Sequence, residues 1–161
     1  MSTSTESHTL PHPNGQATVE FHWSNDRFDH YIRIGELTLR SIAGSAQDTW
    51  PASPPLQQLS LEEIESREIA FGVGLAGTSH WSVSVEPTED GFRFDWACRT
   101  KEPPGFLGTT YEPNVHFEFR AGEASALNMG SAAIVVTPED STHDSAGTAR
   151  WSYEVAVAKN T

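Results

Sequence analysis

The sequence predicts an all-β protein: one single-domain antiparallel β-sandwich or β-barrel of about 8–9 strands, with one short helix near residues 60–68. Three observations lead to this prediction. Apolar and polar residues alternate with period two along much of the chain, which is typical of half-buried strands. Glycine, proline and aspartate gather between the alternating segments, as they do in turns. Five tryptophans and eight phenylalanines among 161 residues are enough to fill one core.

The first half of the chain supplies three strands and the helix. Residues 1–16 are rich in Ser, Thr, Pro and His, and we expect a flexible N-terminal tail before a single domain over 17–161. Alternation then predicts strands over 17–24, 28–35 and 36–43. A loop with three prolines follows over 44–58. Ser60 and Glu63 have the spacing of a capping box, which predicts the short helix.

The stretch FGVGLAGTSHWSVSVE, residues 71–86, contains Gly72, Gly74 and Gly77 in the G-x-G-x-x-G spacing of a dinucleotide-binding loop. That loop requires a helix to begin at its last glycine. The residues after Gly77 alternate with period two instead and favour a strand. We therefore interpret the glycines as a bulge and a tight turn of a sheet, and predict no cofactor.

The second half of the chain continues the alternating pattern. We expect Ile69, Phe71, Val73 and Leu75 to share one face of a strand. The turn residues 87–91 join strands 79–86 and 91–99 into a hairpin. The remaining predicted segments are long loops over 99–114 and 137–148 and strands over 115–120, 131–137 and 149–158, with Val115, Phe117 and Phe119 facing inward.

Charge and cysteine content exclude several classes of function. Ten Lys and Arg residues against 22 Asp and Glu give a net charge of −12, which disfavours nucleic acid and anionic membranes as partners. The chain has one cysteine, Cys98, so no internal disulfide is expected. The N-terminal residues lack the basic and apolar regions of a secretory signal, and no apolar run approaches the length of a membrane span. We expect a soluble cytoplasmic protein.

Gly74, His80, Ser82 and Glu86 resemble the first metal motif of the cupin family, a glycine followed by H-x-H and then a glutamate. The resemblance covers about a dozen residues, and Ser82 stands at the second histidine. It implies a barrel with a metal site that His22 or His116 would complete if their strands were neighbours. Because the second histidine is missing, we predict no bound metal.

The polar strand faces carry Arg, His, Asp and Glu side chains, among them Glu20, Arg93 and Asp95. Two carboxylates there would serve acid–base catalysis, or Arg–carboxylate pairs would link neighbouring strands on a wet surface. We favour the surface pairs. Cys98 alternates with Trp96, which predicts a buried thiol rather than a nucleophile.

Three aromatic residues, Trp50, Phe106 and Tyr111, lie in the two long loops, outside the alternating pattern. They either bind a ligand or fold back to cap the open ends of the sheet. With Arg99 they are our candidate binding residues; no catalytic residue is assigned. We expect a non-enzymatic binding or interaction module for a small ligand or a protein partner. The alternative is a cupin-like barrel enzyme that uses polar-face histidines and carboxylates.

Overall fold

The computed structural model describes residues 6–45, 47–139 and 147–158. They form thirteen strands in three antiparallel sheets, which confirms the all-β class. A four-stranded sheet has the order β1-β2-β3-β4, a six-stranded sheet the order β10-β13-β8-β7-β6-β5, and a three-stranded sheet the order β11-β12-β9. The strands are β1 Ser7–Pro11, β2 Ala17–Ser24, β3 Arg27–Ile34, β4 Leu37–Arg40, β5 Gln58–Ile64, β6 Arg67–Ala76, β7 Ser79–Pro87, β8 Gly91–Thr100, β9 Thr109–Tyr111, β10 Phe117–Ala121, β11 Ser125–Met129, β12 Ile134–Pro138 and β13 Gly147–Val157.

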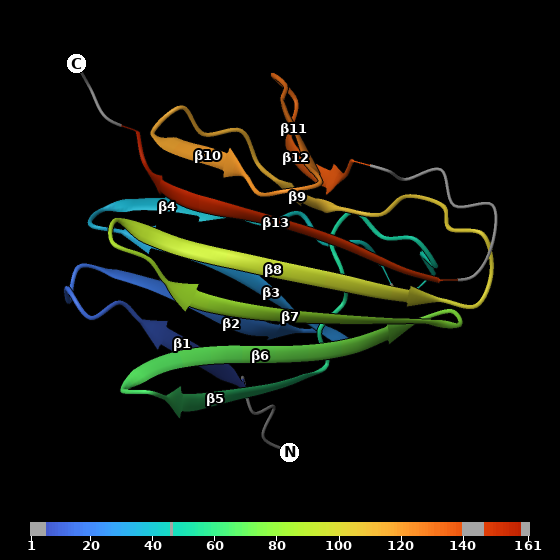
Figure 1. The fold of residues 1–161 in the computed structure, drawn as a ribbon, viewed down its shortest axis with the longest axis horizontal. Coiled ribbons are helices and arrows are strands. Elements are labelled where there is room, and N and C mark those ends of the chain that lie inside the picture. The colour runs from blue at the N-terminus through green and yellow to red at the C-terminus, as the bar shows by residue number, and fades with distance from the viewer. Residues whose placement is uncertain (1–5, 46, 140–146, 159–161) are drawn as a thin grey trace.

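The four-stranded and six-stranded sheets form two layers around one hydrophobic core (Figure 1). In the view of Figure 1, β13, β8, β7 and β6 lie in front of β1, β2 and β3. The rings of His30 on β3 and Phe94 on β8 meet across the core, with centroids 5.5 Å apart. Alternation explains this arrangement, because β2, β7, β8 and β13 each direct one row of apolar side chains into the space between the sheets.

The three-stranded sheet continues the back layer beyond β4. Ser41 pairs with Tyr111 of β9 in an isolated bridge, and the Glu112 N–H donates to the Arg40 carbonyl at 2.9 Å. A second bridge joins Phe28 of β3 to Leu56, in the segment that leads into β5. The sequence prediction of a single sandwich or barrel of 8–9 strands is therefore too simple, since thirteen strands lie in three sheets.

The predicted helix at 60–68 is wrong. Residues 58–64 form strand β5, and Glu65 and Ser66 make the turn into β6, where Ile64 pairs with Arg67. The Ser60 hydroxyl donates to Glu62 at 3.5 Å rather than capping a helix. Leu59 and Leu61 pack against the core while Ser60 and Glu62 are exposed, which is the period of a strand. Pairing with β6 decides the conformation of a segment whose capping spacing alone suggested a helix.

The four residues Ile69, Phe71, Val73 and Leu75 share one face of β6, as predicted, but it is the outer face of the sheet. Val73 and Leu75 are 48% and 51% exposed, whereas Ala70 is buried and Gly72 and Gly74 face inward. A Cβ at Gly74 would overlap the carbonyl oxygen of Pro55, and one at Gly72 would meet Leu59 at 2.8 Å. The glycines leave room for the chain that passes over the inner face of β6, so the apolar side chains of β6 point outward.

Other predicted features are confirmed or corrected in detail. The hairpin at 87–91 is confirmed: β7 pairs with β8, and the Thr88 N–H donates to the Gly91 carbonyl at 2.8 Å. Gly77 lies in the two-residue turn between β6 and β7, with φ of 57°. Val115 was expected to face inward but is 87% exposed, because it lies in the loop before β10.

Two expected non-strand regions contain strands. Residues 7–11 of the expected tail form β1, which pairs with β2. Residues 109–111 of the expected loop 99–114 form β9. Residues 1–5 of the tail and 140–146 of the expected polar loop lie outside the described residues. Over the described ranges, no helix has the length and apolar character that crossing a membrane requires.

Candidate functional site

The outer face of the six-stranded sheet carries side chains in rows that cross the strands. The register places Leu75 of β6 opposite His80 of β7, His80 opposite Arg99 of β8, and Arg99 opposite Thr148 of β13. The next row along the strands has small residues at its centre: it runs Val73, Ser82, Ala97, Arg150. In both rows of the outer face, β6 thus contributes an apolar side chain and β13 a polar one.

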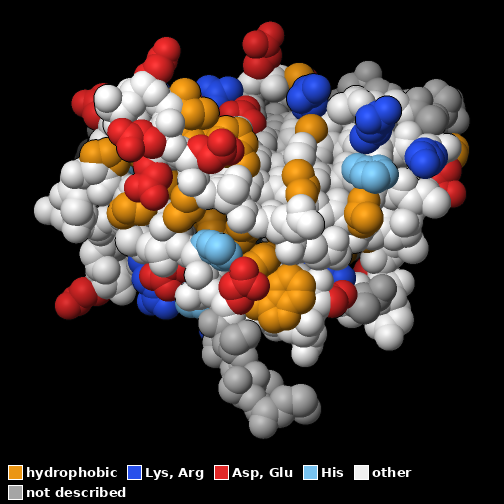
Figure 2. Space-filling view, turned by 90° about the horizontal axis from the view of Figure 1, so that it is seen from below, with side chains coloured by type: hydrophobic (Ala, Val, Ile, Leu, Met, Phe, Trp, Pro, Cys, Tyr) orange, Lys and Arg blue, Asp and Glu red, His pale blue; other side chains and the backbone are white. Residues whose placement is uncertain are grey.

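A hollow of about 620 Å³ lies over these two rows. Its floor contains Ser82 and Ala97, its apolar side contains the exposed Val73 and Leu75, and its lining includes Arg99 and Arg150. A second hollow of about 550 Å³ shares Val73, Ser82, Ala97 and Arg150 with the first and continues along the strands. We call the two together the trough. Figure 2 shows, at its upper right, a histidine beside basic side chains and next to hydrophobic ones.

The two arginines of the trough, Arg99 and Arg150, differ from the other arginines of the chain in their partners. Five arginines form ion pairs with carboxylates: Arg27 with Asp26, Arg33 with Glu20, Arg67 with Glu86, Arg93 with Asp95, and Arg120 with Asp90. Arg40 lies over the ring of Tyr31, 5.1 Å from its centroid. Neither Arg99 nor Arg150 has a carboxylate partner among residues 6–45, 47–139 and 147–158. Both line the same hollow.

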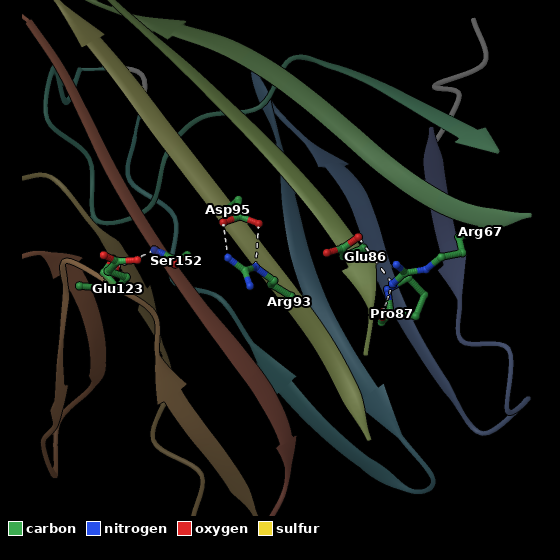
Figure 3. Close-up of polar contacts among 8 residues, drawn as sticks. Arg67, Glu86, Pro87, Arg93, Asp95, Glu123 and Ser152 are labelled. Atoms are coloured by element: carbon green, nitrogen blue, oxygen red, sulfur yellow. Dashed lines mark hydrogen bonds and ion pairs between the residues drawn. The ribbon is translucent and has the colours of Figure 1, made fainter. Parts of the chain in front are cut away.

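The second hollow leads toward a different set of charges (Figure 3). Arg93 and Asp95, two residues apart on β8, form two hydrogen bonds of 3.0 and 3.3 Å. These contacts raise the pKa of Arg93. Figure 3 shows this pair between Glu123 on one side and the Glu86–Arg67 pair on the other. The sequence predicted Arg–carboxylate pairs that link neighbouring strands. Arg67 of β6 and Glu86 of β7 form such a pair, whereas Arg93 and Asp95 lie on the same strand.

Glu123 lies in the turn between β10 and β11, which hydrogen bonds fasten to β13. The Gly122 N–H donates to the Ser152 carbonyl at 2.9 Å. The Ser152 N–H donates to the Ser125 hydroxyl at 2.8 Å, and that hydroxyl donates to the Glu123 carbonyl at 3.4 Å. Glu123 thus has a fixed main-chain position beside the row that contains Ser152 and Asp95, and it lines the second hollow.

A buried chain of hydrogen bonds lies inside the core, on the opposite side of the sheet. The Tyr111 hydroxyl is 2.7 Å from Nε2 of His30 and 2.6 Å from the Tyr153 hydroxyl, to which the Trp96 indole N–H donates at 3.0 Å. Burial lowers the pKa of His30 to about 3. Burial raises the pKa of Tyr111 and Tyr153, so all three groups are neutral at neutral pH. These groups satisfy one another and are sealed from solvent.

The structure separates the four predicted binding residues. Arg99 lines the trough, whereas Tyr111 is fully buried and has no surface for a partner. Trp50 packs edge-on against Trp81, with ring centroids 6.0 Å apart, and its ring occupies the space that a Cβ at Gly105 would need. Phe106 is 39% exposed. Trp50 and Tyr111 therefore pack against the protein itself, as expected if they cap the sheet rather than bind a ligand. The four residues do not meet in one site.

Sequence reasoning missed Arg150, Val73 and Leu75 as site residues. A signal for Arg150 was present, since alternation in β13 places it on the face opposite Trp151. No such signal existed for Val73 and Leu75, because an apolar row normally indicates the buried face of a strand. Their exposure depends on the chain segment that occupies the inner face of β6.

The cupin-like residues occupy one strand but have different neighbours. His80, Ser82 and Glu86 lie on the outer face of β7, with Glu86 3.6 Å from Arg67. His22 lies in the other layer, 3.0 Å from Glu20, and His116 precedes β10. Over the described ranges no group of three or more His, Cys, Asp or Glu residues is placed to hold a metal ion.

Burial raises the pKa of the Cys98 thiol to about 12, so it is protonated at neutral pH.

Comparison with known proteins gives no match: no family model, no curated protein and no solved structure matches this chain.

Proposed function

We propose that the chain is a non-catalytic binding module whose trough holds a small ligand with an anionic group and an apolar part. The observation that carries this proposal is the position of Arg99 and Arg150 beside the exposed Val73 and Leu75 around one hollow. A flexible segment of a protein partner with the same chemistry is a second source of such a ligand. A cytoplasmic site of action remains our expectation.

The anionic group is supported by the arrangement of positive charge. Arg99 is directly opposite His80, and it is a diagonal neighbour of Arg150, because Arg150 pairs with Ala97 two residues away on β8. Diagonal neighbours on antiparallel strands are about 7–8 Å apart, which one carboxylate can span. Two positive charges this close repel each other, and an anion between them offsets the repulsion. Arginine also binds a carboxylate through two parallel hydrogen bonds.

The apolar part of the ligand is supported by the β6 side of the trough. Val73 and Leu75 are about half exposed, although most large apolar side chains of the neighbouring strands are buried. Covering about 100 Å² of such surface contributes about 2.5 kcal/mol. The floor residues Ser82 and Ala97 are small, so a ligand can lie against the sheet between the apolar and the basic side.

The alternative, a barrel enzyme that uses polar-face histidines and carboxylates, has less support. In the trough, His80 lies opposite Arg99 rather than a carboxylate, Asp95 is engaged by Arg93, and Glu123 lies at the Asp95 row, four residues from the row of His80. A general base requires a carboxylate or imidazole placed toward the substrate proton. Asp95 is instead engaged with a guanidinium, as expected for a surface pair.

The experiment is a titration with octanoate followed by ¹H–¹⁵N NMR, with octanol as the uncharged analogue. We expect octanoate to shift the amide signals of β7, β8 and the adjoining part of β13, and octanol to bind at least tenfold more weakly. Arg99→Gln and Arg150→Gln should each weaken octanoate binding about tenfold, the loss of one charge-assisted hydrogen-bonded contact. Leu75→Ser should weaken octanoate and octanol alike.

The matched control is Arg120→Gln, which removes the same charge from an exposed arginine of the same sheet outside the trough. It should bind octanoate as the parent protein does. Equal losses in Arg120→Gln and Arg99→Gln would show that only net charge matters, and signals shifted elsewhere would contradict the site.

A further inference from the structure

We propose that the natural occupant of the trough is a short extended peptide of three to four residues with a free carboxyl terminus and a free amino terminus. This inference rests on the function proposed above and specifies its ligand. The carboxylate lies at Arg99 and Arg150, the ammonium group lies at Glu123, and the peptide backbone runs along the floor between them.

The length of the trough sets the length of the ligand. Arg99, Ala97 and Asp95 lie on the same face of β8, so Arg99 is four residues from the Asp95 row, while Arg150, opposite Ala97, is two residues from it. At about 3.3 Å per residue the longer separation, to Arg99, is about 13 Å. Glu123 lies beside Ser152, which pairs with Asp95, so it is at the far row. An extended peptide of three to four residues spans the same distance between its terminal charges.

The far end of the trough selects positive charge through Glu123. Asp95 also lines the second hollow, but two hydrogen bonds from Arg93 engage its carboxylate (Figure 3). No ion pair or side-chain hydrogen bond involves the Glu123 carboxylate within the described ranges. Hydrogen bonds join the turn that contains Glu123 to β13, so the main chain that carries the Glu123 side chain is held in place. Opposite charges thus stand at the two ends.

The middle of the trough fits a polypeptide backbone. The floor positions Ser82, Ser84 and Ala97 are small, and the serine hydroxyls are donors and acceptors for peptide groups. Phe71 and Val73 line the same hollow on the β6 side, where an apolar side chain of the ligand finds contact. The proposed specificity is therefore for two terminal charges at a fixed separation and at least one apolar side chain.

Four probes test this inference: the tetrapeptide Ala-Leu-Ala-Leu with free termini, its N-acetyl form, its C-terminal amide, and octanoate. Affinity is measured by calorimetry and the site by NMR. The free peptide should bind more tightly than octanoate, and amidation should weaken it at least tenfold. N-acetylation should weaken it about fivefold, the usual size of an exposed ion pair. Glu123→Gln should weaken the free peptide by a similar factor and leave the N-acetyl peptide unchanged.

Glu118→Gln is the control, because Glu118 is an exposed glutamate of the same sheet on β10, away from the trough. It should preserve the preference for a free amino terminus. If octanoate binds at Arg99 and Arg150 but the peptide is insensitive to N-acetylation or to Glu123→Gln, the ligand class is wrong while the proposed function stands. If neither octanoate nor the peptide shifts the trough signals, the proposed function itself fails.

Discussion

Tyr111 and His30 show how burial changes what a single residue does. Tyr111 lies in a sequence segment rich in loop residues, yet its hydroxyl joins His30 and Tyr153 in the centre of the core. Burying unpaired polar groups costs free energy, so these three stabilise the native packing only as a set. At neutral pH no charge is buried at His30, because its imidazole is neutral, with a pKa of about 3.

The buried imidazole predicts a pH dependence of stability. The unfolded state binds a proton on His30 below about pH 6.5, whereas the folded state does not until about pH 3. Stability is therefore lost as pH falls through this window, by about 2 kcal/mol between pH 7 and pH 5. Urea unfolding at several pH values measures this slope.

His30→Phe should remove the slope above pH 5, where the carboxylates are still ionised, whatever its effect on absolute stability. His116→Gln, at an exposed histidine, serves as the control and should keep it. A parent protein with equal stability at pH 7 and pH 5 would rule out a neutral buried His30.

Among the elements, the hairpin of β5 and β6 has an unusual turn. Ile64 pairs with Arg67, so the loop consists of Glu65 and Ser66, whose φ angles are 52° and 66°. Positive φ at both loop positions belongs to the type I′ turn, which favours Asn-Gly. Neither glutamate nor serine prefers this conformation, which costs about 1 kcal/mol or more at each such position. The twist of the paired strands holds the turn in place.

The double change Glu65→Asn and Ser66→Gly should stabilise the protein by about 1 kcal/mol, because both residues then match the turn. The measurement is chemical unfolding at pH 7. Thr78→Gly in the β6–β7 turn is the counterpart, since Thr78 does not have a positive φ. It should destabilise by about 0.5–1 kcal/mol. A loss of stability in the double variant would contradict the turn assignment.

At the scale of the whole molecule, the segment before β5 connects the two layers. The Phe28 N–H of β3 donates to the Leu56 carbonyl at 2.7 Å, and the Gln57 N–H donates to the Val73 carbonyl of β6 at 2.8 Å. Leu56 is buried and packs near the missing Cβ of Gly72. Glycine on β6 thus allows one side of the sandwich to close, and the same closure turns Val73 and Leu75 outward into the trough.

Gly74→Ala should therefore destabilise the whole fold by about 3 kcal/mol or more, since the new methyl group meets the Pro55 backbone rather than a flexible side chain. Thermal unfolding followed by circular dichroism measures the change. Gly147→Ala adds a methyl group that meets nothing within 4 Å and should be nearly neutral. Similar melting temperatures for the two variants would show that Gly74 is not a close contact.

The sequence by itself determined the strand class, the positions of most strands and the hairpin at 87–91, because alternation and turn residues are local signals. Alternation also predicted the inward faces of β2, β7, β8 and β13. The tertiary structure alone decided which face of β6 is buried, because that depends on residues thirteen or more positions earlier in the chain, Pro55, Leu56 and Leu59, which fill the space over Gly72 and Gly74. It also decided that Arg99 and Arg150 meet at one hollow while Tyr111 is buried, since strand order and register are non-local properties that residue spacing does not encode.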